Sequence, residues 1–496
     1  MRNQVQLITY ADRLGGDVAG LRQVVRERFP GVFGGVHVLP FFTPFDGADA
    51  GFDPVDHTTV DPRLGTWSDI RDLSGELDVV VDVIVNHVSA DSAQFRDVIE
   101  RGDASDWAGM FLTYSSVFPA GASEDDLVTI YRPRPGLPFT PMVLGGRRRL
   151  VWTTFTSQQV DLDVSSPQAM AYLHSILDTL QRAGVTMIRL DAVGYAVKTP
   201  GSSCFMTPET FAFIDMLTAH AHERGLDVLV EVHSYFRRQI EIGAVVDRVY
   251  DFAIPPLVLH AAFTGDHAPL LEWMSIRPEN AVTVLDTHDG IGIVDVGPDQ
   301  TAPDSPGLLT SDQLDALVEG IHERTGGKSR QATGWAASNL DVYQVNSTFY
   351  DALGSDDRIY LAARALQFFT PGIPQVYYVG ALAGRNDMEL LASSGVGRDI
   401  NRHHYSPAEL DAELRRPVVE ALNALARFRN AHPAFDGTCT IEHSHGPYAM
   451  WLEWVNGDDR ARLEVNLQTG ATMLTWMGEH GMGRTEDLLT NPPVLS

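Results

Sequence analysis

Cysteine and long apolar stretches are both scarce in this sequence of 496 residues. The two cysteines, Cys204 and Cys439, lie far apart without metal-ligand spacing, which excludes a zinc pattern and a disulfide framework. We expect both to be reduced, buried thiols. No segment approaches the roughly 18 uncharged apolar residues of a membrane-spanning helix, and Met1–Tyr10 lacks the apolar core of a signal peptide. The sequence therefore predicts a cytoplasmic protein.

Positive charge is also in short supply. The 37 lysines and arginines stand against 65 aspartates and glutamates, which gives a formal net charge of −28. Such a surface repels phosphate backbones and anionic lipid, so we expect neither a nucleic-acid nor a membrane partner. An anionic substrate needs a local cluster of arginines that acts against the overall field.

No Gly-x-Gly-x-x-Gly motif follows any strand-like run, which removes the main support for a dinucleotide-binding fold. Eight short apolar runs alternate with helical patterns, and several are continuous, as in parallel strands buried on both faces. The runs are Val5–Tyr10, Gly35–Phe42, Val79–Val85, Met187–Val193, Val228–Val232, Val249–Ile254, Ala281–Leu285 and Pro374–Val379. This alternation predicts an α/β fold, a (β/α)8 TIM barrel.

Two long segments interrupt the alternation. Residues 87–166, rich in Pro, Gly and aromatics, are too long for a plain loop and predict an inserted small domain, domain B. Residues 291–355, with a helical stretch at Ser311–Glu323, predict a second insertion, domain B′. The catalytic barrel then comprises 1–86, 167–290 and 356–435.

Helix signals and a late change of pattern complete the organisation. Helices are expected from Pro167 to Gly184 and from Pro208 to Gly225, because each has Pro at its first position and Gly at its end. After about residue 436 the pattern becomes short and strand-like, which predicts an antiparallel C-terminal β domain over 436–496. The segments are Thr438–Glu442, Tyr448–Val455 and Arg462–Leu467.

Polar side chains follow four of the predicted barrel strands. In such a barrel the active site lies at the C-terminal ends of the strands, so these clusters should meet at one mouth. A single carboxylate there is more often a cap or an ion-pair partner, but four clusters in register are harder to dismiss. The clusters are Asp82…Asn86-His87, Arg189-Leu190-Asp191, Glu231-Val232-His233 and Asp286-Thr287-His288-Asp289.

This set of residue types suits glycosidic bond chemistry. One carboxyl group must be protonated to assist the leaving oxygen, and a second must be ionised to attack the anomeric carbon or activate water. An Arg beside the nucleophile would favour its anion, while burial and nearby carboxylates raise the pKa of the acid. Aromatics such as Phe52, Phe155 and Tyr195 are candidates for stacking on a pyranose, although each also suits a plain core.

The same residue types also bind divalent metal ions at barrel strand ends in hydrolases. Arg189 beside Asp191 argues against that use, because its charge would repel a metal ion from the place it must occupy. We therefore expect no metal and no other cofactor.

The four clusters, in this order, resemble the four signature regions of the α-amylase superfamily, glycoside hydrolase family thirteen. The resemblance covers nearly the whole chain and is closest to the phosphorylases of that family. The stretches that carry it are Gln6–Asp12, Pro40–Asp53, Ile130–Phe139, Glu231–Ser234, Leu285–Ile291 and Asn339–Asn346.

The resemblance implies a role for each site residue. Asp191 is implied as the nucleophile, Glu231 as the general acid/base and Asp289 as the transition-state stabiliser. The glucosyl unit would be held by Asp49, His87, Arg189, His288 and Arg398, and the acceptor side formed by Arg134, Asp341, Val342, Tyr343 and Gln344. Leu190, His233, Phe52, Phe155 and Tyr195 are further candidates for substrate contact. The position of Asn86 helps to bind structural calcium in related amylases, but the phosphorylases are not known as calcium enzymes.

By the same resemblance, the substrates would be sucrose and inorganic phosphate, and the products fructose and α-glucose 1-phosphate. The expected mechanism is retaining, and the expected assembly is a homodimer. Three alternatives stay open: a sister phosphorylase acting on sucrose 6′-phosphate, glucosylglycerol or glucosylglycerate; a retaining α-glucosidase; and an inactive amylase-like accessory protein. An inactive accessory protein of this kind would carry a membrane anchor and would have lost catalytic carboxylates. We expect neither feature in this sequence.

Overall fold

The computed structural model describes residues 1–47, 49–132, 134–299, 302, 304–333, 344–444, 446–478 and 481–495. Within them, eight parallel strands close into a barrel in the spatial order β1-β16-β13-β12-β11-β10-β5-β2. The strands are β1 (Gln6–Thr9), β2 (Gly35–Val38), β5 (Asp78–Ile84), β10 (Met187–Asp191), β11 (Asp227–Val230), β12 (Arg248–Asp251), β13 (Ala281–Thr283) and β16 (Ile373–Tyr377). Each overlaps one predicted run, which confirms the (β/α)8 barrel.

The barrel strands are buried along most of their length, as their continuous apolar runs predict. β5 is buried from Val79 to Ile84, and this stretch includes Asp82, whose carboxylate accepts a hydrogen bond from Arg189 at 2.5 Å. The predicted run Gly35–Phe42 divides, because β2 ends at Val38 and Pro40 has no N–H for a ladder. Strand β3 (Phe42–Thr43) then pairs with β4 (Asp56–Val60) outside the barrel.

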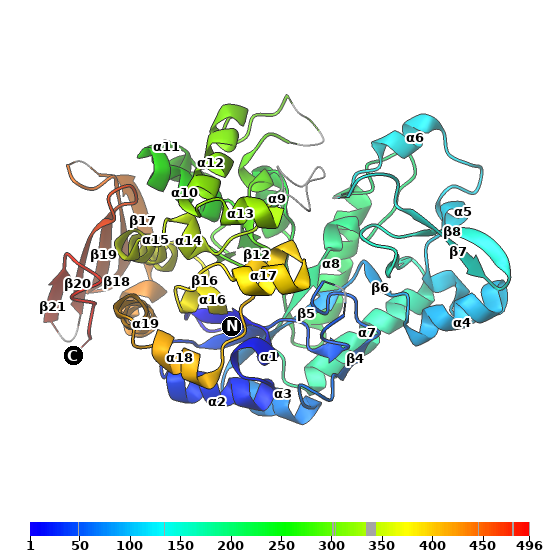
Figure 1. Ribbon diagram of the computed structural model, residues 1–496, viewed down its shortest axis with the longest axis horizontal. Coiled ribbons are helices and arrows are strands. Elements are labelled where there is room, and N and C mark those ends of the chain that lie inside the picture. The colour runs from blue at the N-terminus through cyan, green and yellow to red at the C-terminus, as the bar shows by residue number, and fades with distance from the viewer. Residues whose placement is uncertain are drawn as a thin grey trace.

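Helices surround the barrel (Figure 1). Helix α7 (Pro167–Arg182) begins where predicted, and the Ser166 hydroxyl accepts a hydrogen bond from the backbone N–H of Ala169. The other helices of the described barrel segments are α1 (Ala11–Leu14), α2 (Val18–Arg28), α3 (Trp67–Ser74), α8 (Pro208–His222), α9 (Phe236–Gly243), α10 (Ile254–Thr264), α11 (Ala268–Ile276), α15 (Asp357–Phe369), α16 (Tyr378–Ala381), α17 (Met388–Ser394), α18 (Pro407–Glu413) and α19 (Pro417–Ala431). None of the helices in the described ranges is both long and apolar enough to span a membrane.

The segment 87–166 folds into its own small set of elements. Figure 1 shows β7, β8, α4, α5 and α6 gathered at one end of the molecule, beyond the barrel. The elements are β6 (His87–Ser89), α4 (Ala93–Arg101), η1 (Gly102–Ala104), η2 (Ala108–Met110), α5 (Tyr114–Val117), α6 (Glu124–Thr129), β7 (Phe139–Leu144), β8 (Arg147–Trp152) and β9 (Gln159–Asp161). β6 pairs antiparallel with β9, so the segment leaves and re-enters the barrel at one place.

The segment 291–355 contributes short elements above the barrel mouth. They are β14 (Ile291–Gly292), η4 (Val294–Val296), α12 (Ser311–Arg324), α13 (Lys328–Thr333), β15 (Gln344–Val345) and α14 (Phe349–Ala352). Helix α12 matches the helical stretch predicted at Ser311–Glu323. The division of the chain into domains at the boundaries drawn above stays a prediction.

The described residues after 436 form a five-stranded antiparallel sheet, at the end of the molecule opposite β7 and β8 (Figure 1). Trp454 of this sheet donates a hydrogen bond from Nε1 to the carbonyl of Phe369 at 2.7 Å, which joins the sheet to α15. Its strands are β17 (Thr438–His443), β18 (Met450–Asn456), β19 (Asp459–Asn466), β20 (Ala471–Gly478) and β21 (Gly481–Thr485). The C-terminal sheet is confirmed, with two strands beyond the three segments predicted.

Both cysteines are free thiols, as expected. Cys204 is buried, whereas Cys439 in β17 is only half-buried. Burial raises the pKa of both thiols, that of Cys439 to about 12, so neither has the thiolate character of a reactive cysteine.

A buried ammonium group joins the barrel to the inserted segment. Lys198, one of only two lysines in the chain, follows β10, and its side chain is 2% exposed. Its Nζ lies 2.8 Å from a carboxylate oxygen of Asp161 in β9 and donates to Oδ1 of Asn86 at 2.8 Å and to the carbonyl of Tyr195. The oxygen of Asn86, considered above for a metal ion, therefore accepts from a side-chain cation of the protein itself.

Replacing Lys198 with Met is expected to lower the free energy of unfolding by about 3–5 kcal/mol, because it leaves the buried Asp161 carboxylate without its cation. The melting temperature of the purified variant measures this loss. Lys328→Met, which changes the other, exposed lysine, is the matched control and should melt like the unchanged protein. Equal melting temperatures for the two variants would contradict this role for Lys198.

Candidate active site

A cavity of about 240 Å³ opens at the C-terminal ends of the barrel strands. It brings together thirteen of the site residues expected from the sequence, and these are Asp49, Phe52, His87, Arg134, Phe155, Asp191, Tyr195, Glu231, His233, His288, Asp289, Gln344 and Arg398. Arg189 and Leu190 are not among the described residues that line it. Asp341, Val342 and Tyr343 lie outside the described residues.

Arg189 lies beneath the cavity and contacts three carboxylates. Its side chain is 2% exposed, donates to Asp82 at 2.5 Å and to Asp191 at 2.8 Å, and has a nitrogen 3.9 Å from Glu231. Because Arg189 is a strand residue two positions before Asp191, both side chains project to the same side of β10. A guanidinium that serves three carboxylates fixes the floor of the cavity.

The electrostatics of Asp191 differ from the simple expectation that Arg189 alone sets its charge. Burial, the largest influence, raises the pKa of Asp191, and Arg189 opposes it. The carboxylates of Glu231, Asp82 and Asp289 also raise it, so the net shift is well upward. Crowded carboxylates therefore favour retention of a proton among them. A nucleophile and a general acid together need one proton, and the crowding of these carboxyl groups favours a state in which they hold it.

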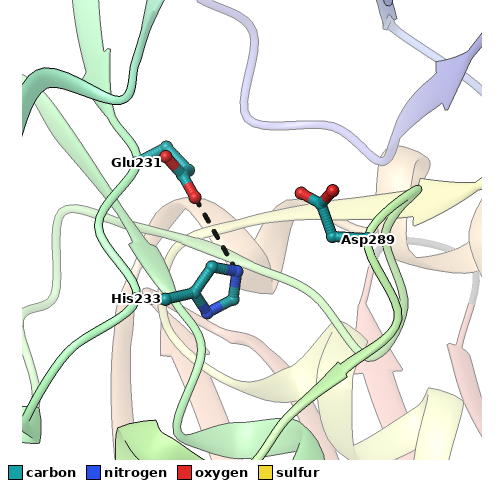
Figure 2. Close-up of side chains that lie close together, drawn as sticks. All are labelled: Glu231, His233 and Asp289. Carbon is teal, nitrogen blue, oxygen red and sulfur yellow. Dashed lines mark ion pairs between the residues drawn. The ribbon is translucent and has the colours of Figure 1, made fainter. Parts of the chain in front are cut away.

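Glu231 follows β11, and its backbone N–H donates to the carbonyl of Leu190 at 3.3 Å. Leu190 itself is fully buried, so it contributes to the site through its backbone and packing, not through a side chain that reaches substrate. The side chain of Glu231 is 12% exposed and projects into the cavity. Its carboxylate lies 3.8 Å from Nε2 of His233 (Figure 2).

Asp289, in the loop after β13, is held as an anion. Burial raises its pKa, but the guanidinium of Arg398, with those of Arg189 and Arg402, outweighs burial and holds the pKa far below its ordinary value. Arg398 has a guanidinium nitrogen 2.8 Å from Asp289 and donates to both carboxylate oxygens of Asp49 at 3.1 Å. These three side chains form a charged clamp on one side of the cavity.

Rings form the apolar walls. Phe52 stacks on His288 with ring centroids 4.8 Å apart and an interplanar angle of 2°. Phe155 meets both His87 and Tyr195 edge-on, each with centroids 5.3 Å apart. Burial lowers the pKa of His87 and lowers that of His288 to about 3, so both rings are neutral hydrogen-bonding groups near neutral pH. Such walls suit a sugar ring, with one apolar face and hydroxyl groups at its edge.

Some lining residues were not predicted. The amide nitrogen of Gln159 in β9 lies 3.1 Å from Nε2 of His87, and Asn346 follows β15. Ala192, Thr333, Val396 and Gly397 also line the cavity. Gln159 lies near the end of the inserted segment, and no spacing in the sequence indicates that it lies near His87. The antiparallel pairing of β6 with β9 brings the two residues together.

Glu231, His233 and Asp289 place one ligand atom each within 4.8 Å of one another, close enough to surround a metal ion. Figure 2 shows the two carboxylates on opposite sides of a gap, with the imidazole of His233 beside Glu231. Asp289 already lies 2.8 Å from Arg398, and Glu231 lies 3.9 Å from Arg189. These cations compete with a metal ion for the same oxygens, so the donor set suits proton transfer and anionic catalysis better.

The geometry therefore offers two half-buried, crowded carboxyl groups, a firmly anionic third and a ring-walled cavity. Two carboxyl groups that share one proton suit displacement at an anomeric carbon. The half-buried Arg134, from the inserted segment, adds a cation at the rim. This cation is the kind of group an anionic acceptor requires on a chain of net charge −28.

Comparison with known proteins agrees with this arrangement. Residues 32–233 match the family model described as alpha amylase, catalytic domain, and residues 434–493 match sucrose phosphorylase, C-terminal. The chain is 56% identical to a sucrose phosphorylase of Bifidobacterium adolescentis over 100% of both chains, and 56% identical to one of Agrobacterium vitis over 96% of this chain and 98% of the other. A crystal structure of sucrose 6F-phosphate phosphorylase from Thermoanaerobacter thermosaccharolyticum superposes with a TM-score of 0.89 at 37% identity, covering 98% of each chain.

Proposed function

We propose that this chain, which belongs to the sucrose phosphorylase family within the α-amylase superfamily, catalyses the reversible phosphorolysis of sucrose to α-D-glucose 1-phosphate and D-fructose. The observation that carries the proposal is the convergence of Asp191, Glu231 and Asp289 on one cavity beside Arg134. The two relatives at 56% identity, each covering nearly the whole chain, support sucrose as the donor.

In the first half of the reaction, the Asp191 carboxylate attacks the anomeric carbon of the glucosyl unit. The bond from this carbon to the fructosyl oxygen breaks, and Glu231 gives that oxygen its proton. Asp289 is the stabiliser, because its anion faces the positive charge that develops on the sugar ring. The clamp of Asp49 and Arg398 is suited to the glucosyl hydroxyls.

In the second half, Glu231, now ionised, takes a proton from the incoming phosphate. A phosphate oxygen attacks the anomeric carbon, and the ester bond to Asp191 breaks. Two inversions give net retention, so the product is the α-anomer. The Phe155 and Tyr195 walls limit the access of water to the covalent intermediate.

One assay tests the proposal. Purified protein is incubated with sucrose, with and without inorganic phosphate, and the glucose-containing product is identified. Glucose 1-phosphate formed only when phosphate is present is the expected result. Free glucose at the same rate under both conditions would favour a retaining α-glucosidase.

The sister phosphorylases share the glucosyl pocket and differ in the leaving group, so the donor distinguishes them. The 37% identical structure of a sucrose 6F-phosphate phosphorylase makes this comparison necessary. We expect sucrose to be used with a much higher kcat/KM than sucrose 6′-phosphate, glucosylglycerol or glucosylglycerate. The reverse order would reassign the chain to a sister activity.

The proposal extends to a cytoplasmic homodimer, which the family resemblance supports. Sedimentation of the purified protein tests the dimer.

Replacing Arg134 with Ala is expected to raise the phosphate concentration needed for half-maximal rate by roughly 10- to 100-fold, the loss of a hydrogen bond to a charged group. Arg134 lines the cavity, and its charge lies close enough to lower the pKa of Arg132, for which burial is the larger cause. Glucosylation of Asp191 should be largely preserved, so the intermediate partitions toward water. The ratio of free glucose to glucose 1-phosphate at limiting phosphate measures this.

Arg147→Ala is the control, because Arg147 lies in β8 of the same inserted segment but is 70% exposed and paired with Asp103. It should leave the ratio unchanged. An unchanged ratio in Arg134→Ala as well would place the anion site elsewhere. Tyr343, expected to assist Arg134, lies outside the described residues.

A further inference from the structure

A buried carboxylate lies behind the acid/base group, outside the catalytic residues named above. Asp295, in η4, has a fully buried side chain, and Oδ2 lies 2.9 Å from Nδ1 of His233. The other oxygen accepts from the backbone N–H of Ser234 and from Nε2 of Gln239, both at 3.2 Å. Because an ionised carboxylate only accepts hydrogen bonds, this contact places a proton on Nδ1 of His233.

The imidazole of His233 is fixed on its other sides as well. Its ring stacks on Phe252, with centroids 3.9 Å apart and an interplanar angle of 16°. Nε2 then faces the cavity, 3.8 Å from the carboxylate of Glu231 and 3.4 Å from the amide nitrogen of Gln344. A ring held in this way presents one nitrogen to the acid/base group and to whatever acceptor approaches it.

The backbone makes room for this contact. A Cβ at Gly292, in β14, would lie 2.5 Å from Oδ2 of Asp295 and 3.1 Å from Nδ1 of His233. Any side chain there would displace the carboxylate or the ring. The contact between Asp295 and His233 therefore depends on glycine at this position.

Three carboxylates of the described residues face His233. Asp295 approaches from η4, Glu231 from the end of its own strand and Asp289 from the loop after β13. Burial, the largest single influence, lowers the pKa of His233, but these three carboxylates together raise it above its ordinary value. Gln344, from β15, is neutral.

We propose that Asp295 is a positioning residue for the second half of the reaction: it fixes the imidazole of His233 with Nε2 toward the acceptor, so that an anionic acceptor is preferred over water. This inference rests on the proposed function. It adds a determinant of the choice between phosphate and water that lies behind the cavity, whereas Arg134 lies at the rim.

The sign of the pH dependence follows from the charge. The cationic form of His233 is present below its pKa and is lost as pH rises through it. Asp295→Asn removes one of the anions that raise this pKa, so the cation is lost at a lower pH than in the unchanged protein. At a pH between the two pKa values only the unchanged protein carries the cation, and at a pH below both values the two proteins carry the same charge at His233.

The experiment measures the ratio of glucose 1-phosphate to free glucose at limiting phosphate, from pH 5 to 8, with sucrose as donor. Phosphate ionises identically in the two assays. The product ratio of the variant is therefore divided by the product ratio of the unchanged protein at each pH, which removes the effect of phosphate ionisation. We expect Asp295→Asn to lower the ratio about tenfold at pH 7, with recovery to within about threefold at pH 5. Gly292→Ala should reproduce this pattern if Asp295→Asn is insoluble, since it moves the same carboxylate.

Two controls separate positioning from general damage. Asp251→Asn removes another buried carboxylate, bound to Arg277 and Trp273 outside the cavity, and should leave the ratio unchanged at every pH. In a His233→Gln background, Asp295→Asn should have no further pH-dependent effect. A loss of the same size at pH 5 and pH 7, no loss at either, or a loss that persists in the His233→Gln background would overturn the inference. If the unchanged protein forms no glucose 1-phosphate, the proposed function fails instead.

Discussion

Asp191→Asn should reduce the rate of glucose 1-phosphate formation from sucrose by at least about 10⁴-fold, as removal of an essential nucleophile does. The amide cannot form the glucosyl ester, because it carries no negative charge and its oxygen is a much weaker nucleophile than a carboxylate oxygen. The amide oxygen can still accept from Arg189, which now donates to the carboxylate at 2.8 Å. The variant should therefore fold, and initial rates at saturating sucrose measure the loss.

Folding is checked on the same preparation by circular dichroism and melting temperature. Asp103→Asn, which changes an exposed aspartate of the inserted segment, controls for removal of one negative charge. Near-normal turnover in a well-folded Asp191→Asn variant would remove the nucleophile role from this residue. It would also remove the double displacement from the mechanism.

Glu231→Gln should have an effect that depends on the donor. Fructose leaves as a poor alkoxide unless it is protonated, so turnover of sucrose should fall by about 10²- to 10⁴-fold, the usual contribution of general acid catalysis. α-Glucosyl fluoride needs no proton to release fluoride, so its glucosylation rate should fall much less. The two rates are measured in the first turnover, as fructose and as fluoride released.

The comparison between donors is internal, so general damage to the fold would affect both equally. An equal loss for both donors would assign Glu231 a positioning role instead of an acid role. Second-half chemistry should be slow with either donor, because the ionised carboxylate that accepts the proton of phosphate is also removed.

The barrel and its mouth could be predicted because both follow from local patterns. A strand such as β5 is continuous and apolar, and the polar cluster that follows it marks the end of the strand. The register of the parallel strands brings these polar clusters together, because the carboxyl ends of parallel strands meet at one edge of the sheet. Asp191 and Glu231 lie near the ends of such runs and Asp289 follows one, so the sequence predicts their convergence on one cavity, where the structure places them.

The residues that escaped prediction depend on contacts between distant segments. Asp295 lies in η4, which follows the two-residue strand β14 and none of the apolar runs that predict the barrel, and its contact with His233 joins segments 62 residues apart. Gln159 reaches His87 only through the pairing of β6 with β9. Leu190, a candidate for substrate contact, differs from its neighbours, because alternation along β10 turns its fully buried side chain away from the side that Arg189 and Asp191 share.

The ammonium of Lys198 between Asp161 and Asn86 occupies a position that a dissolved cation could otherwise bind, and the two kinds of cation differ in how they stabilise a protein. A dissolved ion that binds a folded protein stabilises it by an amount that grows with the logarithm of its free concentration. A cation on a side chain has no dissociation constant and is present once per chain from synthesis onward. The contact of this ammonium with Asp161 and Asn86 therefore does not depend on the concentration of a dissolved metal ion.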